Sequence, residues 1–177
     1  LAPAFGATMA LVTDAGLTAT LSWDLWGWSK DVQLYIKPTT LRVAECGFAV
    51  SCSRAELQRV LSEFHQQYVS MQQAYRDRGE YPMNCPVEIR VTGIDRPEDC
   101  LVPGAQVPLL SAARPWPGHP DWDCVIFFNI LSVPGTPIAP RYYAELEEWF
   151  YANYASYAGV RVEWSKGWAY TEAGPYT

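Results

Sequence analysis

The sequence lacks the features by which several common classes of protein are recognised. It has no cluster of lysine or arginine, and its formal net charge is -6, which argues against a nucleic-acid-binding surface. Its longest apolar stretches, such as residues 124–133, are far shorter than a membrane-spanning helix requires. These absences leave a globular domain as the expected class of protein.

Cofactor and nucleophile motifs are missing as well. No Cys-x-x-Cys pair occurs and there are only two histidines, so a zinc site is not expected. No G-x-G-x-x-G, P-loop or G-x-S-x-G pattern is present, which argues against a phosphate cradle and an esterase nucleophile. We interpret His65, within an expected helix, and His119, within an expected loop, as structural or solvent-facing residues.

The start of the sequence shows no signal peptide. The sequence begins at Leu1 without a methionine, shows no basic segment followed by an apolar one, and ends in Pro-Tyr-Thr. We therefore expect residues 1–177 to form one domain cut from a longer chain, and the sequence assigns it to no cellular compartment.

What the sequence does contain is apolar and aromatic. Hydrophobic residues make up 49% of it and aromatic residues 14%, which is sufficient for a sizeable core. Large aromatic side chains fill cores and also line pockets for bulky apolar ligands, and composition alone leaves both alternatives open. The five cysteines are predicted to be mainly buried free thiols, which behave as small apolar side chains.

The spacing of apolar residues predicts the order strand, helix, strand, strand, helix, strand. This order is typical of an α+β fold of the ferredoxin-like, split β-α-β type, with a mixed or antiparallel sheet, both helices on one face and an N-terminal extension. The extension is predicted to be extended or hairpin-like, with a strand at residues 33–37. The predicted strands cover residues 41–51, 87–92, 123–131 and 160–164, and the predicted helices residues 54–78 and 140–156.

Two local signals refine this pattern. Ser53 and Glu56 have the spacing of a capping box, in which each side chain binds the other residue's backbone amide at the start of a helix. Residues 93–122 are rich in proline and glycine and are predicted to form a long loop. A loop of this length inside a compact domain is expected to be functional or to contain short elements.

Alternation along the strands places several polar residues on the sheet face opposite the helices. The structural interpretation is a solvated face, on which such charges contribute little. The functional interpretation is a face covered by another domain and a ligand, where carboxylates serve as acids or bases, Arg90 stabilises an anion and Asn129 anchors a polar group. The residues assigned to this face are Glu45, Glu88, Arg90, Asn129 and Glu163, together with Phe127 and Val43.

Three segments resemble the substrate-binding (cap) domain of bacterial cholesterol oxidases of the covalent-FAD, vanillyl-alcohol-oxidase type. They are LYIKPTTLR at residues 34–42, YPMNCPVEIRVTG at residues 81–93 and EWSKGWAY at residues 163–170. The middle segment is the most specific, and the resemblance extends over residues 26–171. The chain departs from the family pattern at Asp31 and Cys85.

The resemblance implies a function for the charged face. A separate domain would bind FAD, and this sheet would roof the flavin ring while a 3β-hydroxysterol is oxidised with O2 to give H2O2 and is isomerised to the 4-en-3-one. The family's Glu-x-Arg motif matches Glu88 and Arg90, and its asparagine matches Asn129; these three are the predicted catalytic residues. Glu45, Phe127 and Glu163 are the predicted substrate-binding residues.

A second hypothesis is a stand-alone ferredoxin-like module that binds a small apolar ligand or a protein and has no redox activity. On the first hypothesis the chain alone is predicted to be inactive and to bind no FAD tightly, because it lacks a dinucleotide-binding pattern.

Overall fold

The computed structural model of the 177-residue chain describes Thr8, Leu11 and residues 43–175. The chain divides into two compact units, residues 1–42 and residues 43–177. In the first unit the two described residues, Thr8 and Leu11, are helical, so the predicted extended conformation is wrong at these positions. The predicted strand at residues 33–37 lies outside the described residues.

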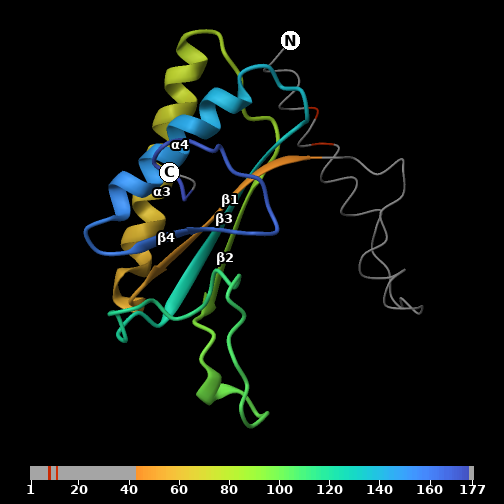
Figure 1. Cartoon of the computed structure of the whole chain (residues 1–177). Helices are drawn as coiled ribbons and strands as arrows, with labels where there is room; N and C mark the ends of the chain where they lie inside the picture. The colour runs from red at the N-terminus through yellow and green to blue at the C-terminus, as the bar shows by residue number, and fades with distance from the viewer. Residues whose placement is uncertain (1–7, 9–10, 12–42, 176–177) are drawn as a thin grey trace, which may run out of the picture. The chain divides into compact units, whose positions relative to one another are not determined.

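The second unit contains a four-stranded sheet in which every strand pair is antiparallel. The spatial order is β2-β3-β1-β4, so that β3 lies between β1 and β2, and β1 lies between β3 and β4 (Figure 1). The sheet is antiparallel throughout, one of the two arrangements that the pattern left open. The strands are β1 (Ala44–Cys52), β2 (Val87–Gly93), β3 (Cys124–Ser132) and β4 (Gly159–Val162).

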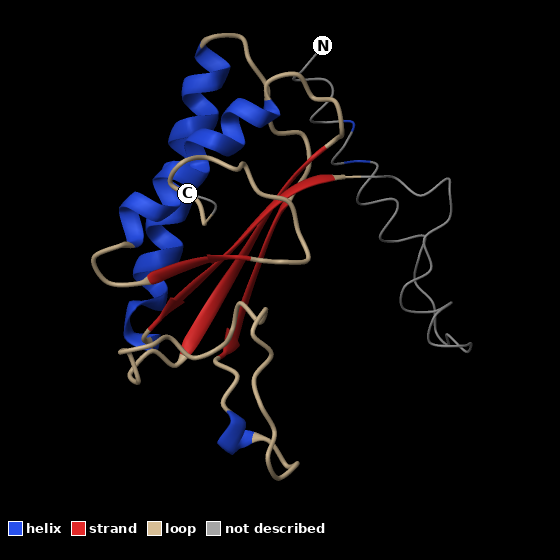
Figure 2. Cartoon of the chain, in the orientation of Figure 1, coloured by secondary structure: helices blue, strands red, loops and turns tan. Residues whose placement is uncertain are grey.

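Both long helices pack against the same face of this sheet, as the pattern predicted. The short 3-10 helix η1 (Arg54–Glu56) leads directly into α3 (Leu57–Asp77), and α4 (Ala139–Tyr154) connects β3 to β4. Figure 2 shows the two helices side by side on one side of the strands. The chain order and the strand order together are those of the ferredoxin-like, split β-α-β arrangement, so the predicted α+β fold is confirmed.

The layer between the helices and the sheet is aromatic. Phe64 of α3 and Phe150 of α4 meet Phe48 and Phe128 of the two central strands, with ring centroids 4.5 Å apart in the pairs Phe48–Phe150 and Phe64–Phe128. Cys46, Cys52 and Cys124 are buried free thiols in the same cluster, as predicted. Aromatic pairs at these separations stabilise a core beyond the area that they bury.

The start of the first helix differs from the prediction. Ser53 precedes η1, but neither its side chain nor that of Glu56 makes the capping-box hydrogen bonds; the Glu56 amide donates to the Ser53 backbone carbonyl instead. The cap comes from the adjoining end of β3, because Asp123 Oδ1 accepts a hydrogen bond of 2.7 Å from the Arg54 amide. A carboxylate from a distant part of the chain therefore replaces the local motif at the helix start.

The long segment between β2 and β3 is a loop, as predicted, and contains the short 3-10 helix η2 (Pro97–Asp99). Its first residue and a later part of it lie on the face without helices, where Ile94, Ala112 and Ala113 pack against Ala49 and Val125. Within residues 43–175, the loop thus covers one part of that face and leaves the part around Arg90, called the open face below, uncovered by the loop.

Candidate functional site

The open part of the sheet face carries the residues that the alternation predicted to lie together. Glu88 is directly opposite Asn129 in the β2–β3 register, and Arg90 is directly opposite Phe127. Directly opposed residues of paired strands share a face of the sheet. The helix-facing cluster contains their neighbours Phe128 and Ile130, so these four residues lie on the face without helices.

Arg90 is the centre of a polar cluster on this face. Its Nε lies 3.0 Å from Glu88 Oε1, so the two side chains, two residues apart on β2, form an ion pair. Its Nη2 donates to Asn129 Oδ1 at 2.8 Å and lies 3.2 Å from both carboxylate oxygens of Glu163. The guanidinium carbon stands 5.2 Å from the centroid of the Phe127 ring, within the range of a cation–π contact.

Asn129 is the buried member of the cluster and Glu88 the exposed one. Asn129 is 1% exposed and donates from its side-chain amide to Glu163 Oε2 at 2.7 Å, so both ends of the amide are satisfied. The Glu88 side chain is 57% exposed and that of Glu163 only 13%. Because both ends of the Asn129 amide are bound, its oxygen is held toward Arg90 and its nitrogen toward Glu163.

Glu163 reaches this cluster because the edge strand β4 stops one residue before it. The Glu163 amide donates to the Gly47 carbonyl, the chain then turns through residues 164–166, and the Gly47 amide donates to the Gly167 carbonyl. Gly47 makes this excursion possible, because a Cβ there would lie 2.8 Å from Cβ of Lys166. The predicted strand to residue 164 is therefore too long by two residues, and its last part is a turn over the open face.

Lys166, which the alternation did not identify, extends the cluster to Glu45. Its Nζ lies 3.3 Å from Glu45 Oε2, and both side chains are mostly shielded from solvent. Both Glu163 and Lys166 lie within one of the three quoted segments, but the predicted strand ended at residue 164 and so assigned Lys166 to neither face. Five ionised groups, three carboxylates and two cations, give the cluster a formal charge of -3 + 2 = -1.

The three carboxylates differ in how fully they are hydrogen-bonded. Glu163 accepts from Arg90, Asn129 and Ser165, with contacts on both oxygens. Within residues 43–175, Glu88 and Glu45 have a cation on one oxygen only. A carboxylate whose oxygens are already occupied is suited to hold its neighbours in place, whereas an oxygen without a donor can accept a proton.

A buried glutamate that the sequence pattern did not single out holds the segment behind this turn. Glu147 of α4 is fully buried, and its carboxylate accepts hydrogen bonds from the amides of Ala169 and Thr171 and from the Thr171 hydroxyl. The Trp168 indole in the same segment donates to the Glu163 carbonyl at 3.3 Å. Glu147 therefore fixes the stretch of chain that carries Glu163 and Lys166.

Arg161 lies at the boundary between the part of the sheet face that the loop covers and the open face. Its guanidinium donates to the carbonyls of Ala112, Arg114 and Pro115 and so ties the long loop to the edge strand. Burial, followed by the nearby positive charge of Arg114, lowers the pKa of Arg161 to about 10. Arg161 thus anchors the loop, while the residues around Arg90 remain uncovered in this unit.

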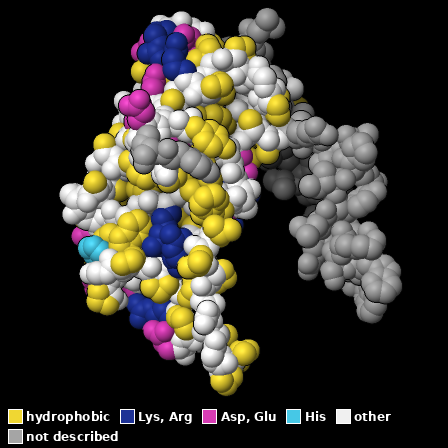
Figure 3. All heavy atoms as spheres, in the orientation of Figure 1, with side chains coloured by type: hydrophobic (Ala, Val, Ile, Leu, Met, Phe, Trp, Pro, Cys, Tyr) yellow, Lys and Arg dark blue, Asp and Glu magenta, His cyan; other side chains and the backbone are white. Residues whose placement is uncertain are grey.

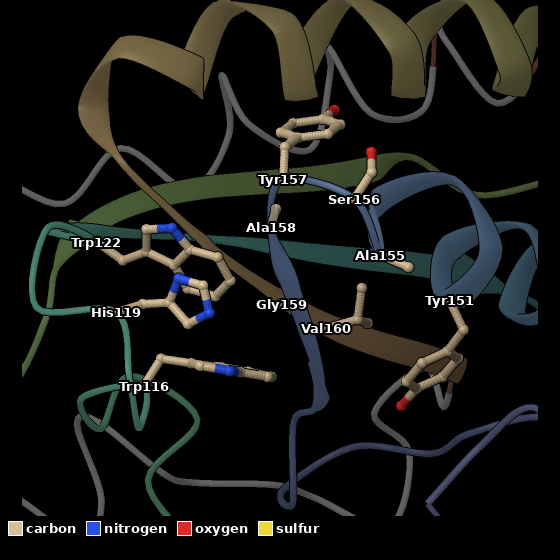
Figure 4. Close-up of a pocket in the computed structure, with 10 residues that line it drawn as sticks. All are labelled: Trp116, His119, Trp122, Tyr151, Ala155, Ser156, Tyr157, Ala158, Gly159 and Val160. Atoms are coloured by element: carbon tan, nitrogen blue, oxygen red, sulfur yellow. The ribbon is translucent and has the colours of Figure 1, made fainter.

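A separate hollow lies between the last part of the loop and the segment that joins α4 to β4, and none of the predicted site residues line it. It has a volume of about 390 Å³ and is bounded by Trp116, His119 and Trp122 on one side and by Tyr151 and residues 155–160 on the other (Figure 4). His119 stacks on Trp122 with ring centroids 3.9 Å apart, as expected of a structural histidine. The polar cluster is therefore a surface feature of this unit and does not coincide with the hollow.

The described residues offer neither a group of metal ligands nor a helix suited to a membrane. Among them, no three His, Cys, Asp or Glu side chains gather closely enough to hold a metal ion. No helix in that same part of the chain has both the length and the apolar character to cross a membrane.

Comparison with known proteins relates this geometry to a family. The family described as cholesterol oxidase, substrate-binding, matches residues 1–177. None of the curated protein sequences compared with the chain matches it.

Solved structures give the same relationship. The chain is 55% identical to a solvent-stable cholesterol oxidase, over 96% of this chain and 32% of that one, with a TM-score of 0.79. It is 49% identical to the cholesterol oxidase from B. sterolicum, over 99% of this chain and 33% of that one, with a TM-score of 0.79. A histidine-to-alanine mutant of the Brevibacterium sterolicum enzyme gives 49% identity, the same two coverages and a TM-score of 0.78.

The chain thus spans about a third of the length of the structures that it matches. The family match covers every residue, and the identities far exceed the level at which likeness reflects fold alone. The chain belongs to the family of cholesterol oxidase substrate-binding domains.

Proposed function

We propose that this chain is the substrate-binding domain of a flavin-dependent oxidase. The enzyme would oxidise the hydroxyl group of 3β-hydroxysterols to a ketone, reduce O2 to H2O2, and isomerise the ketone to the 4-en-3-one. The observation that carries the proposal is the cluster around Arg90 on an open sheet face, in a chain of this family. The remaining two thirds of such an enzyme would supply the flavin-binding domain.

The residues of the open face suit a flavin ring but not a whole dinucleotide. The sequence has no glycine-rich phosphate cradle, so the phosphates of FAD would be held by chain outside these residues. Arg90 offers a positive charge beside the Phe127 ring, at a place where a second domain can cover it. When bound, FAD supplies the acceptor for the two electrons of the alcohol oxidation and passes them to O2.

Within this proposal, Glu88 is the general base. One of its oxygens binds Arg90, and the other has no donor among residues 43–175, so it can take a proton from the substrate. Isomerisation needs the same capacity, because one proton must leave one sterol carbon and return to another. Arg90 and Asn129 complete the catalytic group, Arg90 by stabilising negative charge and Asn129 by holding Arg90 and Glu163 in place.

The substrate-binding residues have distinct duties in the same scheme. Phe127 gives the sterol an apolar surface next to the polar cluster, and Glu45, held by Lys166, borders the site on the β1 side. Glu163 acts mainly through its neighbours, because its oxygens already hold Arg90 and Asn129. The polar groups are thereby held ready before the substrate arrives, which is the condition for electrostatic stabilisation.

The test is peroxide formation by the full-length oxidase that contains this domain. Cholesterol should be oxidised in preference to a panel of non-sterol alcohols, and the Glu88→Gln variant should lose about 10²-fold in turnover, as expected for a general base. Glu80→Gln is a matched control, because Glu80 pairs with Arg78 two residues away as Glu88 pairs with Arg90. Preference for a non-sterol alcohol, or equal turnover by Glu88→Gln and the control, would contradict the proposal.

A further inference from the structure

A pair of cysteines on neighbouring strands is a feature that the proposed function does not use. Cys52 is the last residue of β1 and Cys124 the first of β3, and the two are directly opposite each other in the antiparallel register. Both belong to the cluster that faces the helices, and their Sγ atoms lie 3.7 Å apart. The two thiols are therefore placed to react with each other.

The backbone at this pair already has the spacing of a disulfide. Directly opposed residues of antiparallel strands have Cα atoms about 4.5–5.5 Å apart. A disulfide joins Cα atoms that are about 4.4–6.8 Å apart and brings the sulfurs to about 2.05 Å. Rotation of the two side chains from their 3.7 Å contact can close that distance, so the strands need not move. Cys46 is also buried, but it lies opposite Ile130.

The pair is located where the sheet meets the first helix. Ser53 follows Cys52 and leads into η1 and α3, while Asp123, next to Cys124, accepts the hydrogen bond from the Arg54 amide. Figure 1 shows α3 beginning beside the start of β3. A covalent link between the two cysteines would fasten the junction that Asp123 holds by a hydrogen bond. In the chain-entropy model, a link between residues this far apart in sequence stabilises the fold by restricting the unfolded chain.

Burial determines when the two thiols can react. Hydrophobic side chains reach the surface in many places (Figure 3), but Cys52 and Cys124 are only 0% and 2% exposed. Burial raises the pKa of both thiols above the ordinary value of 9.0, and for Cys52 the neighbouring Cys124 adds to the rise. Because the thiolate is the reactive form, the folded protein should resist oxidation. The reaction therefore belongs to folding or to opening of the strand ends.

We propose that Cys52 and Cys124 form a cross-strand disulfide when the chain folds in the presence of a low-molecular-weight disulfide such as oxidised glutathione. One thiolate attacks the small disulfide and releases a small thiol, and the second thiolate then displaces the other. The two cysteines lose two electrons and two protons, and the small disulfide gains both and leaves as two thiols. The inference does not depend on the proposed substrate.

The experiment detects the cross-link in the full-length oxidase by mass spectrometry. The reduced enzyme is incubated with oxidised glutathione, first in buffer and then in urea just below the unfolding midpoint, and is digested with trypsin without reductant. Trypsin should release residues 43–54 and 91–141, because the arginines within the second peptide are each followed by proline. The expected product is these two peptides joined, lighter by two hydrogen atoms than their sum. It should form about tenfold or more faster in urea, where the buried thiols become accessible.

Single variants identify the cysteines that are joined. The first peptide also contains Cys46 and the second also contains Cys100. Cys52→Ala and Cys124→Ala should each abolish the joined peptide, whereas the matched controls Cys46→Ala and Cys100→Ala should retain it. The cross-linked wild-type protein should melt about 5 °C or more above the reduced protein. Neither alanine variant of the pair should gain this increase in melting temperature on treatment with oxidised glutathione.

Three results would overturn the inference. They are absence of the joined peptide at every urea concentration below the midpoint, a joined peptide that persists in Cys52→Ala or Cys124→Ala, and a cross-linked protein that melts below the reduced one. The last result would mean that closing the bond strains the sheet. Each result concerns the thiols alone, so it leaves the test of sterol oxidation unaffected.

Discussion

The two faces of the sheet are made by the same strands and serve different purposes. The face toward α3 and α4 is mainly apolar: Phe48, Val50, Ile126 and Phe128 on it are all fully buried, and the buried Ser132 hydroxyl accepts a hydrogen bond from Tyr143 of α4. The opposite face carries the loop on one part and the polar cluster around Arg90 on the other. Because successive side chains of a strand point to opposite faces, each strand contributes to stability on one face and to chemistry on the other.

Phe128 and Asn129 show this division in two consecutive residues. Both side chains are almost completely buried, at 0% and 1% exposure, yet Phe128 lies among aromatic rings and Asn129 between Arg90 and Glu163. Burial therefore does not distinguish the core from the site, whereas the chemical nature of the neighbours does. Substitutions on the two faces should have separable effects.

The largest expected effect is loss of a core ring. Phe128→Ala should lower the free energy of unfolding by about 3–5 kcal/mol, because it removes a fully buried side chain and leaves a cavity. Phe127→Ala, one residue away on the open face, should cost only about 1–2 kcal/mol, since its ring is partly exposed. Chemical denaturation of the chain of residues 1–177 measures both. Equal losses would show that the two faces are not energetically distinct.

The next effect belongs to the open face. In the full-length oxidase, Arg90→Ala should slow the flavin half-reactions about tenfold or more, which corresponds to about 1.4 kcal/mol of barrier, with little change in folding. Arg78→Ala is a close control, because Arg78 also pairs with a glutamate two residues away and stands over an aromatic ring, that of Tyr75. Stopped-flow measurement of reduction and reoxidation tests it. Wild-type rates in both steps would make Arg90 an ordinary surface residue.

A smaller effect on stability is expected at the start of η1, which leads into α3. Asp123→Ala removes the carboxylate that accepts from the Arg54 amide and should cost about 1 kcal/mol of stability. Ser53→Ala should cost almost nothing, because the Ser53 side chain makes no cap hydrogen bond. Urea midpoints of the two variants provide the measurement. The reverse order of effects would restore the local capping box as the true cap.

The smallest effect is a pH dependence of stability that arises from Glu63 on α3. Burial alone would raise the pKa of Glu63, but hydrogen bonds from Tyr157, Arg59 and Asn153 outweigh it and hold that pKa below its ordinary value of 4.5. The ionised form is thus favoured in the folded state, so its contribution is complete above pH 4.5 and is lost as the pH falls through the lowered pKa.

Glu63→Gln should therefore flatten the loss of stability between about pH 5 and pH 3. Urea midpoints across this range for wild type, Glu63→Gln and Glu148→Gln test the effect. Glu148 is an exposed carboxylate on α4 without an ion pair in the described part of the chain, so its variant should follow wild type. A Glu63→Gln curve parallel to that of wild type would remove Glu63 as a source of acid sensitivity.

The sequence predicted the elements that depend on regular spacing. Apolar residues two apart in β1 and β3, and three or four apart in α3 and α4, located the strands and helices to within three residues of their observed ends. The same alternation placed Glu88, Arg90 and Asn129 on one face. Spacing is informative here because long antiparallel strands keep their alternation from one end to the other.

Spacing failed where the backbone leaves its regular path. Alternation treated residues 163 and 164 as strand, whereas the chain turns after Val162 over Gly47 and brings both Glu163 and Lys166 to the open face. The capping box failed for a related reason, because Asp123, 69 residues from Arg54, supplies the carboxylate. Both contacts join residues that are far apart in the sequence, so no local spacing predicts them.

By itself, the sequence determined the ferredoxin-like order of elements, the apolar face and the family, since each is written in local spacing or local motifs. Tertiary structure decided which carboxylates are saturated, which part of the sheet face the loop covers, and how buried Glu147 holds the segment that follows Glu163. These features depend on contacts between residues far apart in the chain. Their energies are set by distance and burial, which exist only once the chain has folded.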